Sequence, residues 1–329
     1  MPVKVGIPAS LLYFAHYPMW QTFFAKLGAE VITTGKTNRI LLDEGVKEGL
    51  ADACVPVKLF FGHAIALRNK VDYLFIPRVV CLNGKTVFCP KFLGLPDMVR
   101  YGLPDMPPVI DTRLDSRDKK DRIYKSFLRL GSFLGGGWAE VSRAYLSALL
   151  QNRRYNKLLQ SGLQPTEAMA ALKGLKPPAP MASPSLTFAV LGYPYIIHDR
   201  YISVGILDKL RGMGIRAITT ENLPPGALAR INTGLDKRMF WTYSDMVIRG
   251  AHYVLNRRLV DGVVHVTVFG CGPDSLVNMF LEYKAREHPG IPYINIAVDE
   301  HTGEAGLTTR LEAFVDTVRR KREVIPGHA

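Results

Sequence analysis

An internal repeat limits the possible folds of this chain more than any other feature of its sequence. A segment that begins at Gly6 aligns without a gap with one that begins at Gly192, and both contain Gly-x-Pro, a later glycine and a closing Ile-Thr-Thr. The strand-like runs "VDYLFIPRVVC" and "VDGVVHVTVFGC" also resemble each other. Each repeat alternates β-rich apolar runs with amphipathic helical ones, which indicates a parallel sheet. The sequence therefore predicts an α/β protein of two similar open parallel-sheet domains.

Three regions follow from this alternation. The first α/β domain is expected at residues 1–115. Residues 116–185 are expected to form a helical insertion that ends in the Pro-rich linker "KPPAPMASPS", because their apolar residues recur at helical spacing. Alternation resumes in a second α/β domain at residues 186–329. Two such domains create an interdomain cleft at the carboxyl ends of their strands, where open α/β sheets bind ligands.

Composition narrows the class of protein. The chain has 329 residues, 47% of them hydrophobic, which is enough for two domains with buried cores. Met-Pro-Val-Lys leads directly into strand-like sequence, and no apolar run approaches the roughly 20 residues of a bilayer span, so we expect a cytoplasmic protein without a membrane partner. The net charge of +13 comes from basic residues spread along the chain, without a zinc finger or an Arg-rich tail. Nucleic acid is therefore not expected as a partner.

Three of the four cysteines share a local pattern. Cys54, Cys89 and Cys271 each precede a proline within two residues, and proline commonly starts a helix. A thiol just before a helix faces free backbone N–H groups and the positive end of the helix dipole, which favour the thiolate that binds iron. Spacing alone leaves three interpretations open: buried cysteines at tight turns, a zinc site, or an iron–sulfur cluster with one open iron. Cys81, in "VVCLNGK", lacks the proline.

Four motifs carry a resemblance to a known family: "KTNRILLDEGVKEGLADACVPVKLFFGH", "CPKFLGLPDM", "FGCGPDS" and "DEHTGEAGLTTRLEAF". They look like the domain that accompanies acyl-CoA dehydratase activases, a group that is itself similar to the iron–sulfur subunits of 2-hydroxyacyl-CoA dehydratases. The resemblance implies two flavodoxin-like, or Rossmann-like, domains with a [4Fe-4S] cluster between them, held by Cys54, Cys89 and Cys271. Cys81 is then either a packing residue or a further ligand of a larger or modified cluster.

The same resemblance implies a redox function and its partners. An activase-type ATPase would supply low-potential electrons, which the cluster would pass at its open iron to a small substrate, for which an acyl-CoA is one candidate. A related dehydratase-like subunit is the other implied partner, and a dimer is one possible assembly. This chain is not expected to hydrolyse ATP itself, because Glu30 and Val79 stand where its two Gly-Lys-Thr segments would need the first glycine of a P-loop. Two interpretations stay open: a reductase or dehydratase (lyase) component, and an electron-transfer or regulatory subunit without its own substrate.

Other polar residues are candidates for the same site. His301 and Glu304, in "AVDEHTGEAGL", could transfer protons to or from a substrate, or could order a loop and cap a helix. Lys58 and Lys91 follow two of the cysteines, where a cation would offset thiolate charge; a solvent-exposed lysine is the alternative. Asp274 is expected to cap the helix after Cys271 and is assigned to the surroundings of the cluster.

Overall fold

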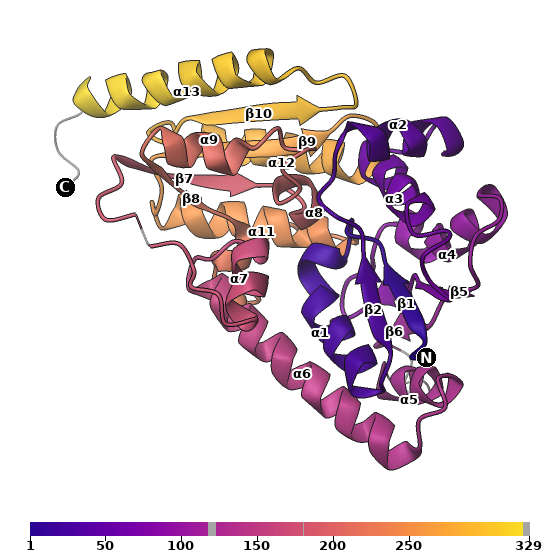
Figure 1. The fold of residues 1–329 in the computed structure, drawn as a ribbon. Helices are drawn as coiled ribbons and strands as arrows, with labels where there is room; N and C mark the ends of the chain where they lie inside the picture. The colour runs from indigo at the N-terminus through magenta and orange to yellow at the C-terminus, as the bar shows by residue number, and fades with distance from the viewer. Residues whose placement is uncertain (118–122, 180, 325–329) are drawn as a thin grey trace. The chain divides into compact units, whose positions relative to one another are not determined.

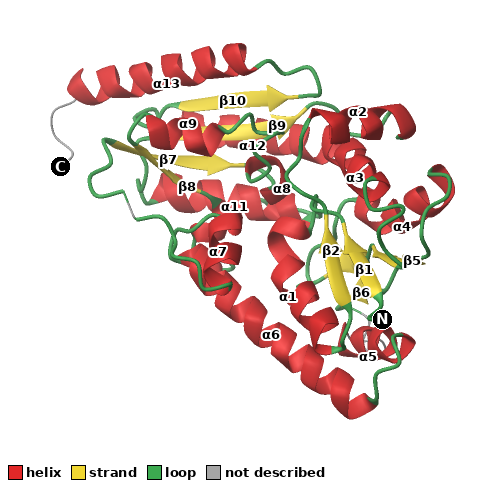
Figure 2. Cartoon of the chain, viewed as in Figure 1, coloured by secondary structure: helices red, strands yellow, loops and turns green. Residues whose placement is uncertain are grey.

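The computed structural model describes residues 1–117, 123–179 and 181–324, and these residues form two compact units. The first unit comprises Met1–Pro177 together with Arg238–Thr242, and the second comprises the described residues of Pro178–Lys237 and Tyr243–Ala329. Each unit contains a four-stranded parallel sheet with helices beside it (Figures 1 and 2). The predicted α/β class with two parallel-sheet domains is confirmed.

The sheet of the first unit has the strand order β2-β1-β3-β5, and all its pairs are parallel. Its core includes the rings of Phe24 and Phe75, which meet edge to face. The elements of this unit in chain order are β1 (Lys4–Ile7), α1 (Tyr13–Lys26), β2 (Glu30–Thr33), α2 (Arg39–Glu48), α3 (Val55–Ile65), β3 (Tyr73–Phe75), β4 (Arg78–Cys81), α4 (Pro90–Gly102), β5 (Val109–Ile110), β6 (Arg113–Asp115), α5 (Ile123–Phe133), α6 (Trp138–Gln160) and α7 (Pro165–Leu172).

The apolar run "VDYLFIPRVV", expected as one buried strand, forms two. β3 ends at Phe75, β4 begins at Arg78, and Pro77 lies between them. Proline has no N–H for the ladder of a sheet, so the run breaks there. β4 then pairs with β6 in a separate two-stranded parallel sheet. Cys81 therefore stands at the end of β4, outside the four-stranded sheet.

The helices that follow β6 pack onto the first unit. α6 contacts α1, α5 and α7, and the buried Tyr155 hydroxyl donates a hydrogen bond to the Phe14 carbonyl at 2.5 Å. The amphipathic face that the sequence shows in this region is therefore buried against α1. As a compact body the first unit runs to Pro177, beyond the limit at residue 115 that alternation alone indicates.

The sheet of the second unit has the order β10-β9-β7-β8, again with parallel pairs only. The inner strands β7 and β9 and the edge strand β10 are the longest strands among the described residues. β7 and β9 are buried along their whole length. The elements of this unit in chain order are β7 (Leu186–Leu191), α8 (Pro194–Ile197), α9 (Ile206–Gly212), β8 (Ile215–Ile218), the 3₁₀ turn η1 (Thr220–Asn222), α10 (Pro225–Leu228), α11 (Thr242–Asn256), β9 (Gly262–Val268), α12 (Gly272–Arg286), β10 (Tyr293–Val298) and α13 (Glu304–Val324).

The two sheets have the same order when strands are counted within each unit. In both, the first strand lies between the second and the third, and the fourth lies outside the third. This is the order in which flavodoxin-like sheets begin. The turn after the first long helix also corresponds: Gly28 has φ +76° and Gly214 has φ +75°. Each donates its N–H to the carbonyl three residues earlier at 3.1 Å, a left-handed helix end that favours glycine.

An aspartate clamps the first strand to the third in both units. Asp72 Oδ2 accepts the Lys4 N–H at 2.7 Å, and the Asp72 N–H donates to the Lys4 carbonyl at 2.9 Å. Asp261 makes the same two bonds with Thr187, each at 2.7 Å. The Val-Asp pair of each repeat therefore performs the same structural task, which explains the resemblance between the two segments.

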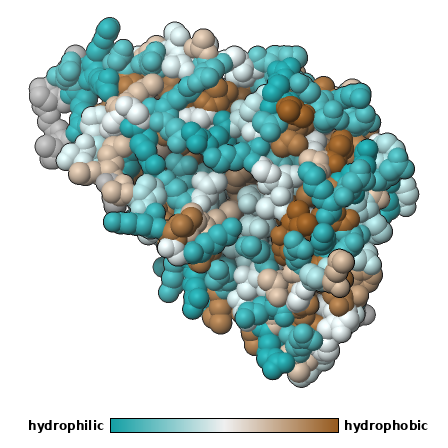
Figure 3. All heavy atoms as spheres, viewed as in Figure 1, coloured by the Kyte–Doolittle hydropathy of each residue, from teal (hydrophilic) through white to brown (hydrophobic). Residues whose placement is uncertain are grey.

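Polar residues predominate on the one face of the surface that Figure 3 shows. In the face shown in Figure 3, hydrophilic residues surround separate apolar patches. Among the helices that the structure describes, none combines the length and the apolar character that a membrane crossing requires.

Candidate functional site

Each of the three predicted cluster ligands is the residue immediately before a helix. Cys54 precedes α3, Cys89 precedes α4 and Cys271 precedes α12, and every one of these helices has a proline in its first two positions. The carbonyl of each cysteine accepts a hydrogen bond from the first turn, at 2.9 Å for Cys54 and Cys89 and at 3.0 Å for Cys271. The cysteine–proline pattern of the sequence thus gives three thiols at helix starts, with similar backbone angles at Cys54 and Cys89 and a smaller ψ at Cys271.

Cys54 and Cys89 come together in the first unit, with Lys91 beside both. Burial raises the pKa of the Cys54 thiol, and a charge on Cys89 raises that pKa further. The Val57 N–H and the Lys91 ammonium both lower it, but they do not outweigh burial. Burial also raises the pKa of Cys89, whereas the N–H and the charge of Lys91 lower it to a smaller extent. Burial therefore outweighs the helix N-terminus, contrary to the expectation of a thiolate. A metal ion that binds here displaces protons from the thiols.

Lys58 lies one turn after Cys54 on α3, and its side chain is only 9% exposed. The alternative of a solvent-exposed lysine is therefore wrong for this residue. At this residue α2 packs closely on α3: a Cβ added to Gly45 would lie 1.9 Å from the Lys58 carbonyl oxygen. Lys91 is half-buried, and its charge acts on both neighbouring thiols.

A distant segment holds the chain just before Cys89. The Val87 N–H donates to the Phe240 carbonyl at 3.0 Å, and the Thr242 N–H donates to the Val87 carbonyl at 2.7 Å. The Thr86 and Thr242 hydroxyls are 3.0 Å apart. Sequence reasoning missed this contact, because nothing in the local pattern of residues 238–242 marks them as part of the first unit.

Cys81 has protein groups around its sulfur. It is fully buried, Ser116 Oγ donates to its Sγ at 3.5 Å, and the thiol faces Asn83 Oδ1 at 3.8 Å. The Cys81 carbonyl also accepts the Ser116 N–H at 2.8 Å. These contacts favour the packing role among the two that the sequence left open.

Cys271 stands where β9 turns into α12. Gly270 has φ +77°, which reverses the chain direction after Val268, and the Cys271 N–H donates to the Val268 carbonyl at 3.2 Å. The strand order of the second sheet reverses between β7 and β9, so this turn lies at the carboxyl end of the sheet beside the switch point where such folds bind ligands. The half-exposed thiol is thus placed on a binding edge.

Asp274 does not cap its helix as expected. No side chain caps α12, and both carboxylate oxygens of the fully buried Asp274 lack a hydrogen-bond partner among the described residues. The Nε2 of the buried His265 lies 3.5 Å from its Oδ1. Asp274 is therefore paired with a histidine inside the second unit.

His265 connects Asp274 to a chain of hydrogen bonds that sequence reasoning missed. The Tyr293 hydroxyl donates to Asn278 Oδ1 at 2.8 Å, and Asn278 donates to Glu282 at 2.8 Å. His265 Nδ1 lies 3.1 Å from this hydroxyl and 3.4 Å from Asn295 Nδ2. The only sequence signal was a histidine in the middle of an apolar strand.

A second buried pair lies at the carboxyl end of β7 and β8. His198 Nε2 is 3.1 Å from Glu221 Oε2, and both side chains are largely buried. Burial raises the pKa of Glu221, but the hydrogen bond and the charge of His198 outweigh it and hold that pKa below its ordinary value. This pair was not among the predicted site residues.

His301 and Glu304 are exposed. Asp299 orders the loop before α13 by accepting the His301 N–H at 2.9 Å and the Thr302 hydroxyl at 2.9 Å. Glu304 accepts a hydrogen bond from Lys209 Nζ at 2.6 Å, which lowers the pKa of its carboxyl group. The Asp299 contacts support the loop-ordering role that the sequence left open; a catalytic role for His301 and Glu304 stays a prediction.

The described residues contain no group of three or more histidine, cysteine, aspartate or glutamate side chains arranged to hold a metal ion. Two of the three predicted thiols, Cys54 and Cys89, are neighbours in the first unit, and Cys271 belongs to the second.

Comparisons with known proteins give one family. No curated protein matches the chain. A solved structure of an ABC transporter periplasmic solute binding protein from Actinobacillus succinogenes 130z, with bound D-allose, is 11% identical and covers 97% of this chain and 92% of its own, with a TM-score of 0.21. A TM-score this low does not indicate a shared fold or function. Residues 4–223 match the model of the family described as "CoA enzyme activase uncharacterised domain (DUF2229)". Because that match covers more than half of the residues of this chain, the chain belongs to the CoA enzyme activase uncharacterised domain family.

Proposed function

We propose that this chain is an iron–sulfur redox protein of the 2-hydroxyacyl-CoA dehydratase-like group. In this proposal Cys54, Cys89 and Cys271 hold a [4Fe-4S] cluster that accepts low-potential electrons from an ATP-dependent activase. Membership of a family described by its relation to CoA enzyme activases supports the link to such a partner.

The neighbouring thiols of Cys54 and Cys89 carry this proposal. Both immediately precede helices, and a backbone N–H of the first turn lies near each sulfur, that of Val57 at Cys54 and that of Lys91 at Cys89. Lys91 adds a positive charge, which offsets the charge of two thiolates. Soft thiolate ligands, N–H donors and a nearby cation are what an iron–sulfur cluster requires, so the residues present fit the group. Cys271, which also immediately precedes a helix, is proposed as the third ligand.

The proposed cluster supplies one-electron reduction of a small substrate at an iron without a cysteine ligand. The residues of this chain contribute the thiols and the cations Lys58 and Lys91 that balance their charge. The half-exposed turn at Cys271 leaves room for a ligand on the binding edge of the second sheet.

Anaerobic purification tests the cofactor. We expect a brown protein with about four irons and four sulfides per chain and the electron paramagnetic resonance signal of a reduced cubane cluster. A colourless protein, after anaerobic reconstitution with iron and sulfide, would contradict the proposal.

Four cysteine variants test the ligands. Cys54→Ala, Cys89→Ala and Cys271→Ala should each lose most of the bound iron, while Cys81→Ala should keep it, because its sulfur already contacts Ser116 and Asn83. Cys81→Ala is the matched control for the loss of a thiol. Full iron in Cys271→Ala would remove Cys271 from the ligand set.

Reduction by an activase and ATP, with and without acyl-CoA thioesters, separates a catalytic component from an electron-transfer subunit. Reoxidation of the cluster by a thioester supports a substrate of its own. Reduction without reoxidation by any thioester supports the electron-transfer alternative.

A further inference from the structure

The sheet of the second unit ends at a strand whose outer edge is open. β10 pairs with β9 and with no other strand among the described residues. The Pro292 and Val298 carbonyls accept hydrogen bonds from Val263 and Phe269, so the even-numbered residues of β10 face β9. Tyr293, Asn295 and Ala297 therefore direct their backbone N–H and C=O groups outward. A flavodoxin-like sheet continues with a fifth strand at this position.

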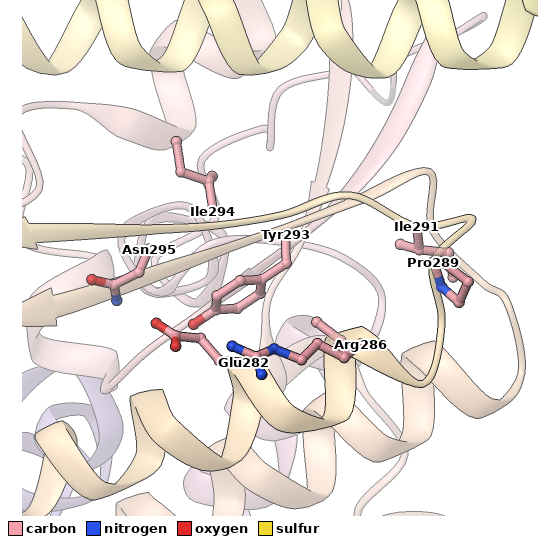
Figure 4. A pocket seen from close by; sticks show the side chains of 8 residues that line it. Glu282, Arg286, Pro289, Ile291, Tyr293, Ile294 and Asn295 are labelled. Carbon is pink, nitrogen blue, oxygen red and sulfur yellow. The ribbon is translucent and has the colours of Figure 1, made fainter.

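A groove runs along this edge. Its volume is about 500 Å³, and it is lined by Glu282, Ala285, Arg286, Pro289, Ile291, Tyr293, Ile294 and Asn295. Three consecutive residues of β10 line it. Because successive side chains of a strand point to opposite faces, side chains alone could not place all three in the lining, so the backbone edge itself forms part of the wall. Figure 4 shows Tyr293 and Asn295 on the side of Glu282 and Arg286, and Ile294 on the opposite side. The groove thus offers both a backbone ladder and places for alternate side chains.

The lining of the groove holds one basic and one acidic side chain, and two basic side chains of α13 donate to its carbonyls. Arg286 lines it and forms no ion pair with any described residue. From α13, Arg310 donates to the Asn295 carbonyl at 2.9 Å, and Lys321 donates to the Pro289 carbonyl. Glu282 is the one acidic side chain that lines the groove, and it accepts a hydrogen bond from Asn278. Two cations of α13 are thus added to a lining with one base and one acid, which favours an acidic ligand.

We propose that this edge binds an acidic, extended segment of a partner protein as an added strand. The outward N–H groups of Tyr293, Asn295 and Ala297 supply main-chain hydrogen bonds, and Arg286, Arg310 and Lys321 pair with acidic side chains of the segment. A second copy of this chain is disfavoured as the occupant, because two such edges would bring the same three cations against each other. The proposal does not depend on the iron–sulfur cluster.

The test uses a fluorescent six-residue peptide that alternates glutamate and valine, with a lysine–valine peptide as the charge control. Binding to the full chain is followed by fluorescence anisotropy at low salt. We expect saturable binding of the acidic peptide, weakened by added salt, and at least about tenfold weaker binding of the basic one. Absence of binding up to millimolar peptide, or equal binding of both, overturns the proposal.

Two substitutions at Ala297 separate strand addition from simple charge attraction. Ala297→Pro removes one outward N–H without removing a bond to β9, whereas Ala297→Val keeps that N–H. We expect roughly tenfold weaker binding for Ala297→Pro and less than about twofold change for Ala297→Val. Equal affinities of the two variants for the acidic peptide would show that the cations alone bind it, and would overturn the proposal of an added strand. Arg286→Glu should weaken the acidic peptide and improve the basic one.

Hydrogen exchange of the unmodified protein gives a readout that needs no variant. The amides of Tyr293, Asn295 and Ala297 should exchange more slowly when the acidic peptide is present, and unchanged exchange contradicts the proposal. Sedimentation of the free protein tests the other occupant: a dimer that Ala297→Pro dissociates shows that this edge pairs with a second copy, and overturns the assignment to an acidic partner.

Discussion

The two units share a scaffold but differ at the carboxyl ends of their strands. Both have the same strand order, the same left-handed glycine and the same aspartate clamp. The first unit has two thiols whose charges interact, and the second has one thiol with two buried histidine–carboxylate pairs, of which His198–Glu221 lies beyond the strand ends and His265–Asp274 starts inside β9. The difference teaches that the repeat conserves what holds the sheet together, while the residues beyond the strand ends are free to take different chemistry.

The close packing of α2 on α3 in the first unit gives the largest expected effect. A Cβ added to Gly62 would lie 1.8 Å from the Leu41 carbonyl oxygen, so Gly62→Ala must push α2 away from α3. We expect the free energy of unfolding to fall by about 3 kcal/mol or more. Urea denaturation measures it, with Gly102→Ala as control, because a Cβ there meets nothing within 4 Å. Equal stability of the two variants would show that the helices separate without cost.

The buried histidine of the first unit predicts a dependence on pH. Burial lowers the pKa of His63 to about 4 from 6.5, and its ring contacts Thr34 and Thr37 at 2.5 and 3.0 Å. The unfolded chain therefore binds a proton before the folded one does. Stability from neutral His63 is complete above pH 6.5 and is lost as the pH falls toward 4, by on the order of 3 kcal/mol.

Denaturation between pH 7.5 and 4.5 measures this loss. His63→Gln should be less stable at neutral pH, but its stability should fall less steeply with acid than that of the unmodified protein. If both fall in parallel over the interval, His63 is not the group that titrates.

The aspartate clamps test whether the two scaffolds are equivalent. Asp72→Ala and Asp261→Ala each remove a carboxylate that accepts a backbone N–H at 2.7 Å, so each should cost about 2 kcal/mol. Asp43→Ala, which breaks only an exposed ion pair with Arg39, should cost about 0.5 kcal/mol. If only one of the two substitutions lowered the free energy of unfolding, the two aspartates would not have equivalent roles in the repeats.

The paired glycine turns give the smallest effect. Ala at Gly28 or Gly214 must adopt a φ near +75°, which should cost about 1 kcal/mol at each site. Gly212, at the end of the same helix as Gly214, lies outside the left-handed region and has no atom near its added Cβ, so Gly212→Ala should be neutral or stabilising. Thermal melts of the three variants check the order.

Local patterns in the sequence predicted much of the scaffold. The repeat predicted two sheets of one topology, and the cysteine–proline pairs predicted three thiols at helix starts, because a proline near a helix start acts through its own backbone. The single strand expected over residues 71–80 was wrong, although Pro77 was a visible reason for a break. Asp274 was wrongly expected to cap its helix, because a capping pattern does not show that a buried histidine lies opposite.

The sequence by itself determined the α/β class, the repeat and the position of each thiol before a helix, since these depend on neighbours along the chain. Only the tertiary structure decided that Cys54 and Cys89 are neighbours, that Lys58 is buried, that His265 meets Asp274, and that residues 238–242 pair with Val87. Such contacts join residues far apart in sequence. They depend on how helices and strands pack, and packing is decided by the whole fold and not by the spacing of a motif.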